Sequence, residues 1–136
     1  MHSTNYFNTL IEVAEDCRAA AGAIPPEKGG KKTVANLQYE MLQEHPYQYT
    51  SDDVLFAVFA TRKEIPQEEW DEQRARFFAK GQPCFRASPL PKTYGWGIHS
   101  NVEGKIAMVG VETAEYQKLM ADEAVAKTKA MRSKRA

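Results

Sequence analysis

The stretch that decides the fold is residues 94–111, which read YGWGIHSNVEGKIAMVGV. Its two halves, 94–100 and 105–111, are rich in aromatic and aliphatic residues and flank a short polar link, a pattern typical of two antiparallel strands joined by a turn. We expect the link, 101–104, to form a type I turn with Gly104 in the left-handed conformation, because glycine adopts positive φ without a steric penalty. The sequence therefore predicts a β-hairpin here.

A third strand is predicted at residues 6–14, where aromatic, aliphatic and β-branched side chains continue over a strand-like length. Apolar residues at helical spacing predict helices over four further ranges: 34–44, 52–63, 66–80 and 114–127. Because such helices bury their apolar faces against a sheet, the predicted fold is α+β, a small antiparallel sheet of about three strands covered by about four helices.

Between the third helix and the hairpin the sequence changes character. Gly81 is expected to end the helix in the left-handed conformation that glycine favours. Residues 82–92 contain three prolines and are predicted to be extended and irregular.

The chain of 136 residues has the length of one domain, and its formal net charge is zero. That balance is uneven, because residues 127–136 carry five basic side chains and no acidic one, which leaves 13 basic and 18 acidic residues in the rest. We predict a single domain at 1–126 and a basic, frayed tail at 127–136. An acidic body makes nucleic acid an improbable partner, since phosphate binding needs a basic surface.

Other classes of protein are disfavoured as well. The longest apolar run, 54–60, is far shorter than the roughly 20 residues that span a membrane. The start of the chain lacks the pattern of a secretory signal, and two cysteines are too few for a disulfide framework, so a cytoplasmic location is expected. Histidines and cysteines are scattered without ligand spacing, so neither a metal nor another cofactor is predicted.

Residues 80–99 form the most unusual segment, because no acidic residue occurs between Glu72 and Glu103. Alternation along the strand places Gly95, Gly97 and His99 on one face and leaves the backbone bare at the two glycines. The segment is therefore predicted to bind a small anionic ligand or an acidic partner through side chains that supply charge, shape and hydrogen bonds: Arg86, Lys92, Tyr94, Trp96 and His99.

Three interpretations of this segment stay open. The first is the non-catalytic binding module just described. The second is a small enzyme that uses Cys84 or His99. The third is a structural or protein-interaction protein without a small-molecule site, in which Arg86 pairs with a carboxylate such as Asp52 or Asp53 and the glycines make room for an aromatic side chain. The oligomeric state is not predicted.

Several strings of the chain resemble one family of proteins: NYFNTLIEVAEDC at 5–17, KTVANLQYE at 32–40, YTSDDVLF at 49–56, and KGQPC at 80–84 continuing to YGWGIH at 94–99. Over roughly residues 5–120 the chain is similar to a family of small uncharacterised bacterial proteins, a domain of unknown function. The resemblance implies a bacterial, cytoplasmic, single-domain protein. It supplies no activity, cofactor or catalytic residue.

Overall fold

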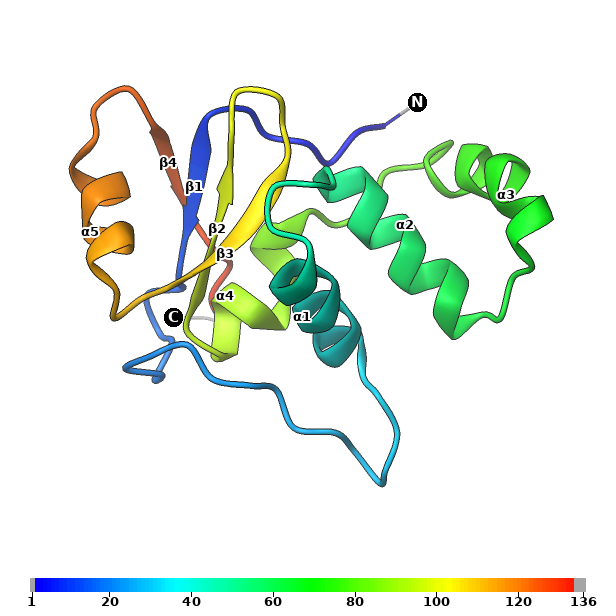
Figure 1. Ribbon diagram of the computed structural model, residues 1–136, viewed down its shortest axis with the longest axis horizontal. Coiled ribbons are helices and arrows are strands. Elements are labelled where there is room, and N and C mark those ends of the chain that lie inside the picture. Colours follow the sequence, from blue (N-terminus) through cyan, green and yellow to red (C-terminus); the bar gives the residue numbers. More distant parts are fainter. Residues whose placement is uncertain (1, 134–136) are drawn as a thin grey trace.

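The computed structural model describes residues 2–133 and confirms the α+β class (Figure 1). Its sheet has four strands in the order β3–β2–β1–β4. In chain order these are β1 (Thr9–Glu12), β2 (Trp96–Ser100), β3 (Ile106–Gly110) and β4 (Ala126–Lys129). The first three are antiparallel neighbours as predicted, whereas β4 runs parallel to β1 and makes the sheet mixed.

The hairpin between β2 and β3 forms where it was predicted. Gly104 has a φ of +83°, and its amide donates to the carbonyl oxygen of Asn101 at 3.0 Å, which closes the turn. The Asn101 side-chain oxygen also accepts from the amides of Glu103 and Lys105, each at 3.0 Å. Local turn chemistry therefore sets the register of this half of the sheet.

The predicted helix over 114–127 is wrong at its end. The helix α5 (Ala114–Ala121) stops six residues earlier, and the chain turns back to form β4 beside β1. The amide of Ala126 donates to the carbonyl of Asn8 at 3.0 Å, and that of Ala130 to Glu12 at 2.9 Å. These bonds satisfy an edge of β1 that would otherwise expose unpaired backbone groups.

The start of the predicted frayed tail thus lies in the sheet, and Ala130, which is 4% exposed, packs in the main core. Residues 134–136 of that tail lie outside the described residues.

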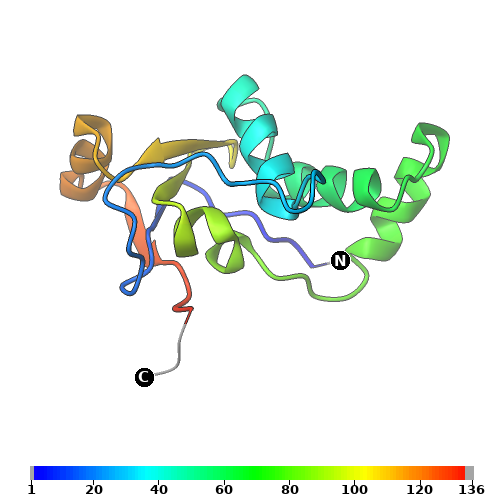
Figure 2. The same ribbon diagram turned by 90° about the horizontal axis from the view of Figure 1, so that it is seen from below.

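Helices lie on both faces of the sheet (Figures 1 and 2). The helices α1 (Val34–Glu44) and α4 (Pro89–Thr93) pack on one face, and α2 (Ser51–Arg62) packs against α1. Here Ile11, Ile98 and Ile106 join the main core. On the opposite face α5 packs over a smaller cluster: Leu10, Val109, Tyr116 and Val125.

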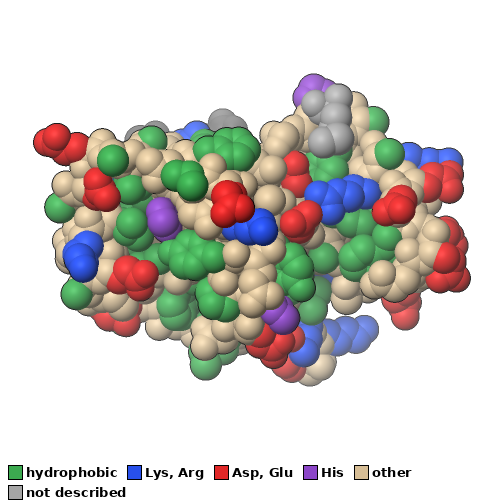
Figure 3. All heavy atoms as spheres, turned by 45° about the horizontal axis from the view of Figure 1, so that its top comes forward, with side chains coloured by type: hydrophobic (Ala, Val, Ile, Leu, Met, Phe, Trp, Pro, Cys, Tyr) green, Lys and Arg blue, Asp and Glu red, His purple; other side chains and the backbone are tan. Residues whose placement is uncertain are grey.

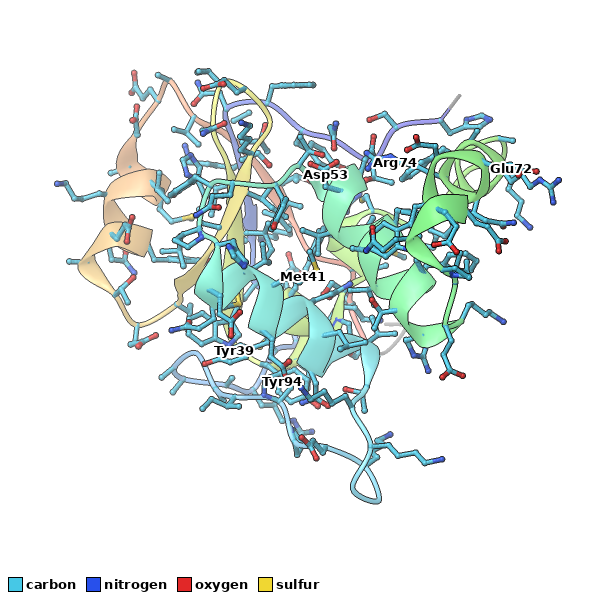
Figure 4. All side chains as sticks on the ribbon, turned by 45° about the vertical axis from the view of Figure 1, so that its right-hand side comes forward. Tyr39, Met41, Asp53, Glu72, Arg74 and Tyr94 are labelled. Carbon is cyan, nitrogen blue, oxygen red and sulfur yellow. The ribbon has the colours of Figure 1, made fainter. Side chains whose placement is uncertain are left out.

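The helix α3 (Trp70–Phe77) packs on α2 instead of covering the sheet as predicted, and the short helix η1 (Gln67–Glu69) precedes it. Its contacts are aromatic: Phe56 lies edge-on to Trp70 at 5.4 Å between ring centroids, and Phe59 lies 4.7 Å from Phe77. An ion pair of 2.8 Å between Arg74 and Asp53 joins the two helices, and Figure 4 shows these side chains pointing toward each other.

The prediction for Gly81 is wrong, because Gly81 has no positive φ and the helix ends earlier, at Phe77. The Gln82 side chain takes over the capping role by donating to the Phe77 carbonyl at 2.7 Å. The prediction that 82–92 is irregular is also wrong, since this segment contains η2 (Phe85–Ala87) and most of α4. Ser88 caps α4 through the amide of Leu90, and a proline suits the first turn.

A long connection between β1 and α1 crosses the lower end of the sheet in Figure 1 and is seen from below in Figure 2. Its middle is attached to the segment before β2, because the amide of Ala23 donates to the carbonyl of Tyr94 at 2.9 Å. Near its end, Asn36 of α1 donates from its side chain to the carbonyl of Pro25 at 2.7 Å. Among the described residues, no helix is long and apolar enough to cross a membrane.

Candidate functional site

The five predicted site residues do not gather around one cavity. Strand alternation places Trp96 on the face covered by α1 and α4 and His99 on the face covered by α5. Arg86 lies in η2, Lys92 lies in α4, and Tyr94 follows α4. A ligand role for these five residues stays a prediction, and they lie at separate places in the structure.

Trp96 holds the long connection in place. Its indole nitrogen donates to the carbonyl of Ala23 at 2.8 Å, its ring packs on Tyr39 with centroids 5.8 Å apart, and its edge covers Gly22. The backbone of Tyr94 closes α4 by donating to the carbonyls of Pro89 and Leu90, both at 3.2 Å. Figure 4 labels Tyr39 and Tyr94 below the ribbon of α1.

Arg86 fastens the end of β4. Its Nε donates to the carbonyl of Lys129 at 2.7 Å, and its own carbonyl accepts from the amide of Met131 at 2.8 Å. The expectation that Arg86 pairs with Asp52 or Asp53 is wrong, because those carboxylates bind other groups. Lys92 lines an open hollow together with Arg18 and Asp16 at the opposite end of α4 from η2.

The bare backbone predicted at Gly95 and Gly97 is covered by the protein itself. A Cβ added at Gly97 would lie 2.6 Å from a ring carbon of Tyr116, which belongs to α5. A Cβ added at Gly95, where φ is +78°, would lie 2.6 Å from the carbonyl oxygen of Ala21. Gly97 therefore admits an aromatic side chain, as the structural interpretation expected, whereas Gly95 admits a crossing backbone, which that interpretation did not include.

His99 is held on the α5 face by one hydrogen bond. Its Nδ1 lies 2.8 Å from the hydroxyl of Tyr47, a residue with a φ of +59°. Its Nε2 is buried and has no hydrogen-bond partner among the described residues. Burial lowers the pKa of His99 below its ordinary value, and the nearby carboxylate of Glu115 opposes this only in part. The neutral imidazole is therefore favoured at neutral pH.

This burial predicts a pH dependence of stability. Because the unfolded chain binds a proton to His99 more readily than the folded chain, the free energy of unfolding should fall as the pH is lowered from 7.5 through about 6.5. The loss should stop once the pH is below the folded pKa. Urea denaturation at half-unit pH steps measures this, with His99→Phe expected to flatten the slope in that window.

The exposed His2 provides the control, since His2→Gln should leave the slope unchanged. A His99→Phe variant that keeps the wild-type slope would assign the pH dependence to other groups.

Cys84 and His99 do not form a nucleophile–base pair. Cys84 precedes η2 on the side of α1 and α2, whereas His99 faces α5. The Cys84 sulfur lies 3.5 Å from the hydroxyl of Tyr6, and both cysteines are free thiols. Burial, together with the hydrogen bond to Cys84, raises the pKa of Tyr6, while nearby Arg86 opposes the change.

A second hollow, smaller than the one beside Lys92, lies between α1, α2, the end of α3 and the segment 82–89. We call it the α1–α2 cavity; its volume is about 280 Å³. Its walls are mainly apolar, and residues from all four segments contribute: Val34, Gln38, Leu55, Val58, Phe59, Arg62, Lys63, Phe77, Gln82, Pro83, Cys84, Ala87, Ser88 and Pro89. None of the five predicted site residues is among them, although 82–89 belongs to the predicted segment.

Besides Gln82, whose amide caps α3, the polar side chains of this cavity fall into two sets. Arg62 and Lys63 are exposed, lie at the end of α2 and bring two positive charges, and no acidic residue is among the described lining residues. Gln38 and Ser88 are buried, at 2% and 5% exposure, and the Ser88 hydroxyl donates to Gln38 Oε1 at 2.6 Å. Charge therefore lies at the surface and a neutral amide lies inside.

One sequence signal could have indicated this cavity. Gln38 lies in the apolar stripe of α1, between Leu37 and Met41, at a position where the helix faces the core. A polar residue in such a stripe needs a buried partner or a ligand. The partner, Ser88, is 50 residues away, so the sequence alone does not identify it.

Charges on the surface are mixed. On the face drawn in Figure 3, acidic and basic side chains are interspersed, with hydrophobic side chains between them. The described part of this face is thus unlike the continuous basic surface on which nucleic acids bind. No group of three or more potential metal ligands occurs among the described residues.

Comparison with known proteins gives one match. No curated protein and no solved structure matches the chain. The profile described as "Family of unknown function (DUF6157)" matches residues 1–136, which is the full length and includes every segment that lines the α1–α2 cavity. The chain therefore belongs to this family of unknown function.

Proposed function

We propose that this protein is a non-catalytic, cytoplasmic module that binds a small, mainly apolar molecule bearing an anionic group in the α1–α2 cavity. The supporting observation is the combination of apolar walls with two cationic side chains and no acidic one among the described lining residues. The proposal keeps the anionic ligand expected from the sequence. It assigns the contacts with the anionic group to Arg62 and Lys63, in place of the five residues predicted from the sequence.

The size of the cavity limits the ligand. Its volume of about 280 Å³ lies just below the range of roughly 300–1,000 Å³ that is typical of small-molecule sites, so the ligand must be small. Side chains such as Leu55, Val58 and Phe59 would cover the apolar body. Removing that body from water supplies most of the binding free energy, and the charges determine which end faces solvent.

Octanoate is a suitable probe, because it joins a short apolar chain to one carboxylate, and 1-octanol is its neutral counterpart. We expect calorimetry to show that wild-type protein prefers octanoate, and that Arg62→Ala and Lys63→Ala each weaken octanoate binding about threefold. The effect is modest because both cations are exposed to water. Binding of 1-octanol should stay unchanged in both variants.

A blocking variant tests the location. Ala87 lines the cavity, so Ala87→Trp should fill it and abolish binding of both probes, whereas Ala79→Trp on the exposed end of the α3 segment should bind normally. Circular dichroism checks that both variants fold. Wild-type protein that binds neither probe, or an Ala87→Trp variant that binds octanoate as tightly as wild type, contradicts the proposal.

A further inference from the structure

Two large apolar side chains lie exposed near each other at the end of the β2–β3 hairpin. Phe7 is 59% exposed, and Val102, which belongs to the turn, is 73% exposed. The Phe7 ring lies on the same turn, because a Cβ added at Gly104 would be 2.8 Å from one of its ring carbons. We call Phe7, Val102 and the neighbouring charged residues Glu103 and Lys105 the hairpin-end patch. Apolar side chains that gather inside a polar rim mark surfaces that bind another protein.

The backbone that carries Phe7 is fixed in place. Asn8, the next residue, has a φ of +46°, a left-handed conformation that costs energy in residues other than glycine. Its amide donates to the carbonyl of Asn101 at 2.9 Å, and its side chain donates to the carbonyl of Ala124 at 2.7 Å. These bonds attach the segment to the hairpin and to the loop before β4. An exposed aromatic side chain on a fixed backbone loses little conformational freedom when it binds a partner.

Opposite charges lie beside the apolar pair. Glu103 is exposed and Lys105 is half-buried, and neither forms an ion pair with another described residue. Figure 3, in which the hairpin end of Figure 1 comes forward, shows hydrophobic side chains with acidic and basic ones between them. In a two-fold symmetric dimer every contact between two different residues occurs twice, once in each direction. A patch with one acidic and one basic residue is therefore complementary in charge to a second copy of itself.

We infer that the hairpin-end patch binds a second copy of this chain in a two-fold symmetric dimer. Phe7 and Val102 pack across the symmetry axis, and Glu103 of each copy pairs with Lys105 of the other. The dimer forms reversibly, because two apolar side chains from each copy cover less area than a permanent interface does. No residue of the patch lines the α1–α2 cavity, so the inference stands apart from the proposed function.

Sedimentation velocity over a wide range of protein concentration tests the inference. The wild-type chain should change from monomer to dimer as the concentration rises, and Phe7→Ser and Val102→Ser should each weaken dimerisation about tenfold. Val102→Ser decides if Phe7→Ser does not fold, because the Val102 side chain is largely in solvent already. The matched control is Ile24→Ser, which is 72% exposed on the long connection at the other end of the sheet and should dimerise as wild type does.

Charge reversal tests the arrangement of the two copies. Glu103→Lys should weaken dimerisation about fivefold, because it places two positive charges opposite each other, and adding Lys105→Glu should restore wild-type affinity. A wild-type chain that stays monomeric at every concentration overturns the inference. So does a Val102→Ser variant that dimerises as tightly as wild type, or an Ile24→Ser variant that is weakened equally. A double variant that remains as weak as Glu103→Lys overturns the two-fold pairing of Glu103 with Lys105.

Discussion

Replacing Gly97 by alanine is expected to lower the free energy of unfolding by about 3 kcal/mol, the upper part of the range for overpacking a core. The added Cβ would lie 2.6 Å from one ring carbon of Tyr116 and 3.3 Å from the carbonyl oxygen of Ile11. Neither neighbour moves freely. Tyr116 is 5% exposed and its hydroxyl accepts from the amide of Val13 at 3.1 Å, while Ile11 belongs to the neighbouring strand β1.

Urea denaturation measures the loss, and two further variants identify its cause. Gly81→Ala is the matched control, because nothing lies within 4 Å of its added Cβ, so its effect should stay within about 0.5 kcal/mol. In a Tyr116→Leu background the ring is absent, and Gly97→Ala should then cost less than about 1 kcal/mol. A Gly97→Ala variant as stable as wild type would mean that α5 can shift away from the sheet easily.

The same glycine shows what the sequence could predict. Alternation along β2 correctly placed Gly97 and His99 on one face, because a strand has a fixed period of two. The hairpin was equally predictable, since Gly104 and Asn101 form its turn with groups only three residues apart. Which group covers Gly97 depends on Tyr116, which reaches the sheet from another element, so the sequence left both a ligand and an aromatic side chain open.

The parallel strand β4 could not be predicted from local pattern. Its residues, Ala126–Lys129, alternate small and basic side chains, and only Thr128 is β-branched. The strand forms because β1 would otherwise be the edge strand of the sheet with unpaired backbone groups, and because Val125 and Ala130 on either side of β4 are buried. The basic composition of 127–136 suggested a frayed tail, whereas pairing with β1 places residues 126–129 in the sheet.

The candidate site was only partly predictable for the same reason. The absence of acidic residues drew attention to the segment 80–99, and residues 82–89 form one wall of the α1–α2 cavity. The other walls come from α1, α2 and α3. These helices are brought together by tertiary packing, which local sequence patterns do not reveal. The excess of basic residues in 80–99 led to the prediction of Arg86 as a ligand contact, but its side chain binds a backbone carbonyl. Arg62 and Lys63 were not predicted, because they lie at the end of a helix whose sequence shows no unusual charge pattern.

The second large expected effect concerns Asp52, which attaches the N-terminal segment to α2. Its side chain is 3% exposed and accepts three hydrogen bonds: from the Thr4 amide and the Thr4 hydroxyl at 2.7 Å each, and from the Ser3 hydroxyl at 2.9 Å. Asp52→Ala should cost about 3 kcal/mol, because it leaves the buried Thr4 donors without their acceptor. Chemical denaturation measures the loss.

The neighbouring residue provides the control for this expectation. Asp53 is also in the first turn of α2, but its carboxylate is 35% exposed, caps the helix through the amide of Thr50 and pairs with Arg74. Asp53→Ala should therefore cost only about 1 kcal/mol. In a Thr4→Val background Asp52→Ala should cost less than in wild type, since one donor is already gone. Equal losses for Asp52→Ala and Asp53→Ala would show that helix capping, and not attachment of the N-terminal segment, accounts for the role of Asp52.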